Sequence, residues 1–303
     1  MAYNPDASNV VLLRKNLDGM ASLNDMLSVS GKVAIVTGGS SGLGFNIVAR
    51  LLEGGACVIV ASDLEESLEN ALGLLAERGY GSDRVAAFTC DVRNEDDVAK
   101  LVAFADETFG SIDILVTSAA VWSYAHIYDM PEDEFVKVID TNLNGTYRVV
   151  KHVSKYMIEH EIPGKMCLIS SNSAWLPYPM FGGYPHYVAS KGGINALAIE
   201  AAKELKRFGI MVNAVAPGAM QTNGALNNMV VEEIDEDAQD ELYAEIAIPQ
   251  TDEMKPVDCV ARIAYMMCTD FAEGVTGECY TVDNGMTHNI MKRQPAIEAY
   301  PYE

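Results

Sequence analysis

Short apolar runs rich in β-branched residues alternate with longer amphipathic stretches from residue 32 to residue 286. The runs are apolar throughout and not only at every second position, which predicts strands buried on both faces, as in a parallel sheet between two helical layers. The stretches between them have the length of crossover helices. Strands are expected near residues 33–36, 58–60, 85–89, 112–116, 168–169 and 212–215, and the first two helices near residues 43–52 and 64–77.

This alternation predicts a single α/β domain over residues 31–286, because no linker, repeat or change of composition interrupts it. Residues 1–30 form a mostly polar N-terminal extension, and residues 287–303 form a proline-containing tail. An acidic segment at residues 223–250 departs from the pattern. Its simplest interpretation is a solvated helix face, and the alternative is a lid over the substrate.

Charge and composition narrow the classes of partner. The 303 residues include 43 Asp and Glu against 21 Lys and Arg, a formal net charge of −22, which disfavours binding to nucleic acid or to an anionic membrane. No apolar run reaches the roughly 18 residues of a membrane span, and the N-terminus is unlike a signal peptide. The six scattered cysteines, three of them (Cys57, Cys90 and Cys167) in or beside strand-like runs, predict buried free thiols, no metal site and a reducing, cytoplasmic location.

A glycine-rich turn, Thr-Gly-Gly-Ser-Ser-Gly-Leu-Gly at residues 37–44, directly follows the first expected strand and opens the first expected helix. Glycines at such a turn let the backbone approach a pyrophosphate, and the helix N-terminus supplies N–H donors and positive potential. A glycine cluster alone is weak evidence, but its position between strand and helix predicts dinucleotide binding.

Two Tyr-x3-Lys pairs occur, Tyr147 with Lys151 and Tyr187 with Lys191. Residues four apart on a helix share a face, so either lysine would lie beside its tyrosine. We favour Tyr187 and Lys191, because this pair opens a helix after a strand that ends in two serines. A neighbouring positive charge is expected to lower the pKa of the phenol and bring it toward the range useful for proton transfer.

With these motifs in this order, residues 31–286 resemble the short-chain dehydrogenase/reductase family, in its single-domain branch. The resemblance implies a Rossmann-type doubly wound parallel sheet of about seven strands with helices on both faces. Thr-Ser-Ala-Ala at residues 117–120 replaces the family's usual Asn-Asn-Ala-Gly, and Val-Asp-Asn-Gly at 282–285 resembles its closing motif. The cofactor contacts implied are Gly38, Ser40, Ser41, Gly42, Leu43, Gly44, Asp91, Val92, Ala119, Ala120, Tyr187, Lys191, Pro217, Gly218, Met220 and Thr222.

The resemblance also implies four catalytic residues, Asn142, Ser171, Tyr187 and Lys191. Tyr187 would exchange the proton, Ser171 would hold the substrate oxygen, Lys191 would tune the tyrosine and bond the nicotinamide ribose, and Asn142 would support a proton relay. Ser171 lies sixteen residues before Tyr187 where the family usually has thirteen, which an insertion in the loop explains. Ser173 is the rival for its role; Ser170 is a weaker one, since strand alternation turns it the other way.

The choice of cofactor depends on charge near the end of the second strand. The family's NAD-selecting acid would fall on Ser62, and Asp63 follows it. A carboxylate there would accept bonds from the ribose hydroxyls and repel a 2′-phosphate, and no Lys or Arg lies in residues 38–44 or 62–70. These features favour NAD over NADP, with Asp63 as a cofactor contact; Asp63 is alternatively the N-cap of the next helix, or serves as both.

Aromatic and other apolar residues flank the expected pocket, which favours a bulky apolar ketone or secondary alcohol, with a steroid-like skeleton as the leading case, as for bacterial hydroxysteroid dehydrogenases. The alternative is that these aromatics pack within the protein or at an interface. A sugar or polyol dehydrogenase is the second candidate, and a non-catalytic dinucleotide sensor the third. The family resemblance implies a homo-oligomer, a tetramer or dimer. The substrate contacts predicted are Trp122, Ser173, Trp175, Tyr178, Phe181 and Tyr184.

Overall fold

The computed structural model of the chain describes residues 19–176, 183–220 and 256–288. Its strands form one sheet in the order β3-β2-β1-β4-β5-β6-β7, and every neighbouring pair is parallel. The predicted doubly wound parallel sheet is thereby confirmed. The strands are β1 (Val33–Thr37), β2 (Cys57–Ser62), β3 (Val85–Thr89), β4 (Ile114–Thr117), β5 (Lys165–Ile169), β6 (Met211–Pro217) and β7 (Cys279–Val282).

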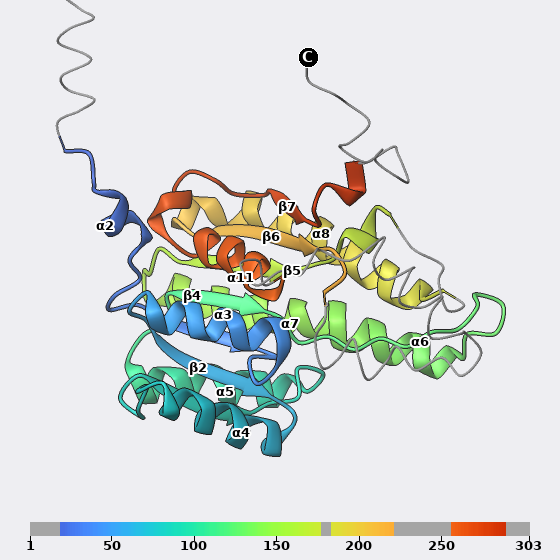
Figure 1. Cartoon of the computed structure of the whole chain (residues 1–303), viewed down its shortest axis with the longest axis horizontal. Helices are drawn as coiled ribbons and strands as arrows, with labels where there is room; N and C mark the ends of the chain where they lie inside the picture. The colour runs from blue at the N-terminus through green and yellow to red at the C-terminus, as the bar shows by residue number, and fades with distance from the viewer. Residues whose placement is uncertain (1–18, 177–182, 221–255, 289–303) are drawn as a thin grey trace, which may run out of the picture.

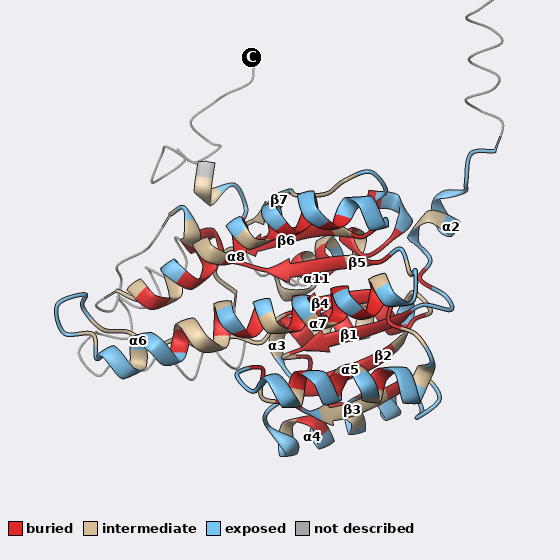
Figure 2. Cartoon of the chain, turned by 180° about the vertical axis from the view of Figure 1, so that it is seen from behind, coloured by how far each residue is buried: buried red, intermediate tan, exposed pale blue. Residues whose placement is uncertain are grey.

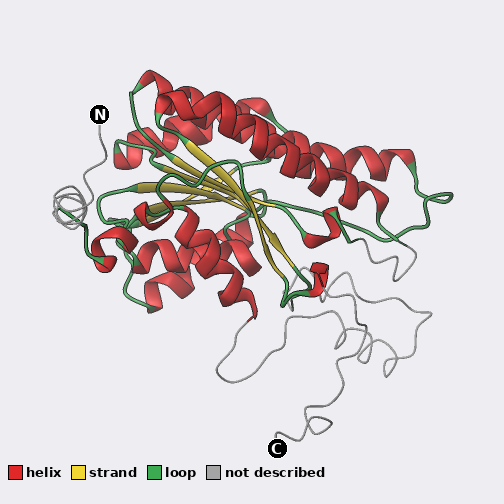
Figure 3. Ribbon diagram, turned by 90° about the horizontal axis from the view of Figure 1, so that it is seen from above, coloured by secondary structure: helices red, strands yellow, loops and turns green. Residues whose placement is uncertain are grey.

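Helices cover both faces of the sheet, with the strands between two helical layers (Figures 1 and 3). The helices α3, α4 and α11 pack on one face, and α5, α7 and α8 pack on the other. Helix α6 extends beyond the sheet, next to the first part of α8 (Figure 2). The helices are α2 (Leu23–Leu27), α3 (Gly42–Glu53), α4 (Glu65–Glu77), α5 (Glu95–Phe109), α6 (Glu132–Ile139), α7 (Gly145–Glu159), α8 (Pro185–Leu205) and α11 (Pro256–Met267).

The strands are apolar at successive positions because their side chains alternate between two hydrophobic cores. In β1, Ala34 and Val36 join the core under α3 and α11, whereas Ile35 joins the core under α7 and α8. In β2, Val58 and Ile59 divide in the same way. Figure 2 shows the central strands buried along most of their length behind helices whose outer faces are exposed, whereas the edge strand β3 is mostly intermediate. The sequence reasoning that took continuous apolar runs for central parallel strands was therefore correct.

A π-helical turn over Asp140–Asn144 joins α6 to α7, a feature that the hydrophobic pattern did not predict. A π turn holds one more residue than an α turn, and such turns are frequent at functional sites. Here the turn buries the Asn142 side chain completely.

The end of the N-terminal extension packs onto the domain. Val29 belongs to the core under α3, its N–H donates to the carbonyl of Gly54 at 3.0 Å, and the Leu27 carbonyl accepts from the Tyr265 hydroxyl. The proposed boundary near residue 30 therefore runs through a segment that contacts the domain. The acidic segment 223–250 and the tail from residue 289 lie outside the described residues.

The six cysteines are free thiols; Cys90, Cys167 and Cys268 are buried. Cys57, expected to be buried, is only half-buried because it begins β2 at the edge of the core. None of the helices in the described parts of the chain has the length and apolar character needed to cross a bilayer.

Candidate active site

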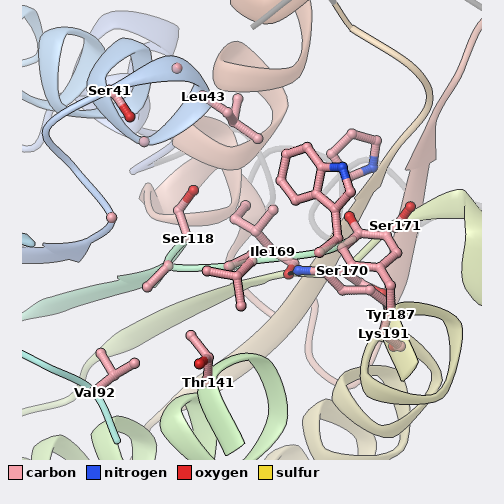
Figure 4. A pocket seen from close by; sticks show the side chains of 18 of the residues that line it. Ser41, Leu43, Val92, Ser118, Thr141, Ile169, Ser170, Ser171, Tyr187 and Lys191 are labelled. Atoms are coloured by element: carbon pink, nitrogen blue, oxygen red, sulfur yellow. Dashed lines mark hydrogen bonds between the residues drawn. The ribbon is translucent and has the colours of Figure 1, made fainter. Parts of the chain in front are cut away.

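A cavity of about 580 Å³ lies at the carboxyl ends of the central strands, where β1 and β4 adjoin and the strand order reverses direction. Ligands bind at this switch point in open parallel sheets because the loops from adjacent strands diverge there. Ser41 and Leu43 lie at one side of the cavity, and Ser171, Tyr187 and Lys191 lie at the other (Figure 4). A single cavity thus joins the glycine-rich turn to the Tyr-x3-Lys pair.

The glycine-rich turn is shaped by two close backbone approaches. Gly38 has a φ of +64°, and a Cβ atom on it would lie 2.6 Å from the backbone nitrogen of Ala119 on the loop after β4. A Cβ on Gly44 would overlap the carbonyl oxygen of Gly38. Side chains at either position would therefore push the loop out of shape.

The donors at this end of the cavity fit a dinucleotide. Helix α3 begins at Gly42, and its N-cap, Ser41, makes no side-chain hydrogen bond to the first turn, so the first N–H groups of the helix are available to an anion. The residues that would hold the cofactor are the cavity-lining members of the predicted set: Gly38, Ser40, Ser41, Gly42, Leu43, Gly44, Asp63, Asp91, Val92, Ala119, Ala120, Tyr187, Lys191, Pro217, Gly218 and Met220. Thr222 lies outside the described residues.

Two carboxylates line the cavity beyond the glycine-rich turn. Asp91 is held by Arg93 through bonds of 2.7–3.0 Å to both carboxylate oxygens, and this contact lowers the pKa of Asp91. Asp63 follows β2, and Leu64, not Asp63, is the N-cap of α4. The alternative that Asp63 serves as the N-cap is therefore wrong; Asp63 lines the cavity.

Tyr187 and Lys191 lie on the first turns of α8, with the Lys191 Nζ atom 5.5 Å from the centroid of the Tyr187 ring. Lys191 is only 2% exposed, and its Nζ donates to the carbonyl of Ile169 at the end of β5, at 2.8 Å. Because Ile169 is the last residue of β5, this bond fixes the amine beside the serines that follow the strand. The other candidate pair differs, since Tyr147 is half exposed and Lys151 bonds Glu95 on the surface.

Burial dominates the proton affinities of the pair. It lowers the pKa of the Lys191 amine to about 7 and raises the pKa of the Tyr187 phenol above its ordinary value. A hydrogen bond between the Ser171 hydroxyl and the phenol acts in the opposite direction on Tyr187. The expectation that Lys191 lowers the tyrosine pKa is therefore corrected for the protein alone: both groups are driven toward their neutral forms, because a dry site disfavours either charge.

The structure separates the three candidate serines by their contacts. Ser171 bonds the Tyr187 phenol and also accepts a hydrogen bond from the backbone N–H of Ser173 at 3.2 Å. The Ser173 hydroxyl is 2.9 Å from the hydroxyl of Tyr184. The Ser170 hydroxyl donates to the Lys191 carbonyl at 3.0 Å, which ties β5 to α8. Of the three, Ser171 is the one placed to share a substrate oxygen with Tyr187.

Asn142 does not line the cavity, although the resemblance implied a catalytic role. Its Oδ1 accepts from the N–H of Val121 at 2.8 Å, and its Nδ2 donates to the Val121 carbonyl at 2.9 Å and to Ser190 Oγ at 3.1 Å. Its own carbonyl accepts from the Thr146 hydroxyl at 2.7 Å. The side chain therefore connects the loop after β4 to α8, and its part in a proton relay stays a prediction.

An aromatic wall closes the reactive end of the cavity. Trp122 and Tyr124, from the loop after β4, lie on the same side as Tyr184, just before α8. Ring centroids are 5.8 Å apart for Trp122 and Tyr187, 5.5 Å for Tyr184 and Tyr187, and 5.5 Å for Tyr124 and Tyr184. Such tilted and edge-on arrangements are favourable contacts between aromatic rings.

Of the predicted substrate contacts, one lies away from the cavity and two fall outside the described residues. Trp175 is 47% exposed and is not among the lining residues; it follows the short 3₁₀ turn Asn172–Ala174. Tyr178 and Phe181 lie outside the described residues. Trp122, Ser173 and Tyr184 do line the cavity.

Sequence reasoning missed several residues at the site. Ser118, Val121 and Ala219 line the cavity from the loops that follow β4 and β6, and Thr141 lines it from the π-helical turn. A signal was available, since the carboxyl ends of parallel strands share one edge of the sheet. No group of three or more histidines, cysteines or acidic residues with the geometry of a metal site occurs among residues 19–176, 183–220 and 256–288.

Comparisons with known proteins agree with this geometry. The pattern that defines the short chain dehydrogenase family matches residues 32–231. A (+)-borneol dehydrogenase 2 of Salvia officinalis is 36% identical over 267 residues, covering 86% of this chain and 91% of that protein. An L-rhamnose 1-dehydrogenase (NAD(P)(+)) of Azotobacter vinelandii is 31% identical, covering 86% and 98%. The solved structure of gox2181 superposes with a TM-score of 0.78 at 31% identity, covering 87% of this chain and 98% of that one.

Proposed function

The chain belongs to the short-chain dehydrogenase/reductase family, and from that premise we propose that it is an NAD(H)-dependent enzyme that interconverts a bulky, apolar secondary alcohol and its ketone. The coarser statement, an oxidoreductase of alcohols and ketones, follows from the family itself. The observation that carries the proposal is the meeting of Ser171, Tyr187 and Lys191 at one end of a cavity whose other end is the glycine-rich turn.

Each residue of the site has a defined task in ketone reduction. The Ser171 hydroxyl holds the carbonyl oxygen, and the Tyr187 hydroxyl donates its proton to that oxygen as negative charge develops there. The neutral phenol that burial favours is the form that can donate. NADH held along the glycine-rich turn would supply the hydride for the carbonyl carbon, and NAD⁺ would accept it in the reverse direction.

Lys191 supports both directions of proton transfer. An amine whose pKa is about 7 changes its charge near physiological pH, so it can return a proton to the tyrosine side of the site after each turnover. The Ile169 carbonyl and the Tyr187 ring hold it in place. In the bound enzyme its remaining N–H donors would face the nicotinamide ribose.

The preference for NAD over NADP is supported by charge at the far end of the cavity. Asp63 and Asp91 both line it, and Lys191, at the opposite end, is the sole cation among the described residues that do so. Arg93 is engaged by Asp91. A 2′-phosphate beside Asp63 would be repelled by its carboxylate. At this end of the cavity, the described lining residues include no cationic side chain that could bind the phosphate.

The aromatic wall supports a broad, apolar substrate with a steroid-like skeleton as the leading case. Trp122, Tyr124 and Tyr184 offer ring faces and edges, which bind flat fused rings by contact area and desolvation. One relative, 36% identical to this chain, is named a (+)-borneol dehydrogenase.

A sugar or polyol is the second candidate, and two observations favour it. One relative is an L-rhamnose 1-dehydrogenase, and the Ser173 and Tyr184 hydroxyls place a polar pair within the wall. Sugars need several such partners, because each buried hydroxyl without a bond is costly.

A substrate panel separates the two candidates. The purified protein is mixed with NADH and, in turn, with steroid ketones, terpene ketones and ketoses, and NADH absorbance is followed. Turnover of ring ketones with kcat/KM at least ~10-fold above that of any ketose is the expected outcome, a difference of about 1.4 kcal/mol. Turnover confined to ketoses would replace the apolar substrate with a sugar, and no turnover of any carbonyl compound while NADH still binds would favour a dinucleotide sensor.

A further inference from the structure

His186 directly precedes Tyr187 on α8, is fully buried, and has no part in the proposed mechanism. Both of its ring nitrogens have partners. Nδ1 accepts from the backbone N–H of Tyr187 at 2.8 Å, and Nε2 lies 3.0 Å from the hydroxyl oxygen of Ser123. The ring is therefore fixed to the residue that carries the reactive phenol and to the loop after β4.

Two acceptors, Nδ1 of His186 and the Glu134 carboxylate, set the direction of these hydrogen bonds. In the tautomer in which Nδ1 accepts from Tyr187, the ring proton resides on Nε2 and is donated to Ser123. The Ser123 hydroxyl in turn donates to Oε1 of Glu134 on α6, at 3.0 Å. Burial lowers the pKa of His186 and so favours the neutral ring, whereas a backbone hydrogen bond at Tyr184 and the charge of Glu134 act in the opposite direction. These hydrogen bonds form a chain, called the His186 hydrogen-bond chain below, that runs from His186 through Ser123 to Glu134.

The His186 hydrogen-bond chain connects three elements: α8, the loop after β4, and α6. Ser123 lies between Trp122 and Tyr124, the two members of the aromatic wall that come from the loop after β4. Asn142 already anchors that loop at Val121, two residues earlier. Asn142 also bonds Ser190 on α8, and the N–H of Ala125 donates to the carbonyl of Gly183 at 3.0 Å. Among these attachments, the one at Ser123 lies between the two rings of the wall and connects them to both α8 and α6.

We propose that His186, Ser123 and Glu134 are positioning residues that hold the aromatic wall at a fixed separation from the Tyr187 phenol and thereby set the bulk of the substrate that the site accepts. The inference about substrate size rests on the proposed function, whereas the inference about the position of the wall does not. Without these hydrogen bonds, the loop would be held only on either side of the wall, at Val121 and Ala125, and the two rings would move more relative to the phenol. A bulky ketone would then lose more contact than a small one.

The position of the wall can be measured directly, since the chain has two tryptophans and Trp175 lies outside the cavity lining. In a Trp175→Phe background, Trp122 is the remaining tryptophan, and its quenching by acrylamide reports how closely it packs. Ser123→Ala should raise the quenching constant at least twofold. The matched control, Ser111→Ala, removes a serine hydroxyl that donates to Asp113 at 3.0 Å near the start of β4, and should leave quenching unchanged. Equal quenching in the parent and Ser123→Ala would overturn the proposal.

Kinetics then test substrate size with native Trp175 retained. Ser123→Ala and His186→Asn should both lower kcat/KM for a fused-ring ketone relative to a small cyclic ketone by at least fivefold, mainly through KM, with the Kd of NADH unchanged. Asparagine keeps an acceptor for the Tyr187 N–H but is too short to reach Ser123. An unchanged ratio in both variants would overturn the role in substrate size. If the parent protein turned over no ketone at all, the proposed function would fail, and the Trp122 measurement would still decide whether the chain holds the wall.

A second pair of variants covers the case in which Ser123→Ala does not fold. Glu134 is 29% exposed at its side chain, so α6 should tolerate its replacement. Glu134→Ala removes the end of the chain and should shift both readouts in the same direction. Glu134→Gln keeps an acceptor oxygen for Ser123 and should restore parent behaviour; two glutamate variants that behave alike would contradict the proposal.

Discussion

The Nζ atom of Lys191 lies 5.5 Å from the centroid of the Tyr187 ring and bonds the Ile169 carbonyl, so the amine links the phenol to the end of β5. Ser171 follows Ile169 by two residues and bonds the phenol from that side. The reactive groups therefore come from one strand end and one helix start. Two rigid elements, and not a loop alone, set their separation.

Replacement of Tyr187 by phenylalanine should abolish most turnover and spare coenzyme binding. The substitution removes the proton donor but keeps the ring that packs against Trp122. A positioned general acid contributes about 10²- to 10⁴-fold, so kcat should fall by at least about a hundredfold. Steady-state rates and the enhancement of NADH fluorescence on binding measure the two effects. Residual turnover within tenfold of the parent rate would mean that another group donates the proton.

Stability should rise with pH above neutrality because of Lys191. Its pKa is about 7 in the folded protein against an ordinary value of 10.5, so between these values the unfolded chain binds more protons than the folded one. Under that condition the free energy of unfolding increases with pH, by at most about 1.4 kcal/mol per pH unit. The increment should be absent in Lys191→Met. The measurement is the difference between parent and variant in urea unfolding at pH 7 and pH 8.5; a difference that does not change with pH would contradict the lowered pKa.

Asp63 should govern the choice between the two nicotinamide coenzymes. Asp63→Ser removes the carboxylate that would repel a 2′-phosphate and should raise kcat/KM for NADPH relative to NADH by about tenfold, or ~1.4 kcal/mol. Because Leu64 is the N-cap of α4, the helix should be unaffected. Equal melting temperatures check this point. A parent enzyme that already prefers NADPH would contradict the assignment of Asp63.

Gly44→Ala should weaken NADH binding by about tenfold or more, on the order of 1.4 kcal/mol, and should destabilise the protein. The added Cβ would overlap the Gly38 carbonyl, so the glycine-rich turn must open. Gly73→Ala on the exposed side of α4 is the matched control, since a Cβ there meets nothing within 4 Å. It should leave NADH binding unchanged and stabilise the protein by up to about 1 kcal/mol. Equal NADH affinity in both variants would show that the turn does not contact the coenzyme.

Much of the fold was predictable because the central strands are buried on both faces. Such strands give unbroken apolar runs, and the expected strand at residues 33–36 lies within β1, Val33–Thr37, all of whose residues are buried. The first helix, expected at residues 43–52, spans Gly42–Glu53. Strand β7 was not predicted as an element, because its residues are only half-buried and its pattern is weaker.

The site was predictable where chemistry depends on local order in the chain. Gly38, Tyr187 and Lys191 belong to motifs whose members are close in sequence. The chain from His186 to Glu134 could not be found in this way, because its three residues are brought together only by the packing of α6 against α8. Trp175 was misplaced for a related reason, since apolar character alone does not tell which side of a turn a ring occupies.

The π-helical turn at Asp140–Asn144 makes the geometry of the pocket depend on the number of residues before α7. Because a π turn holds one residue more than an α turn, the loss of one residue here would return it to a regular α turn and leave α6 and α7 in register. Asn142 would then leave Val121 and Ser190, and the loop that carries Trp122 would lose that attachment. A single-codon deletion at this turn should therefore loosen the aromatic wall without unfolding either helix.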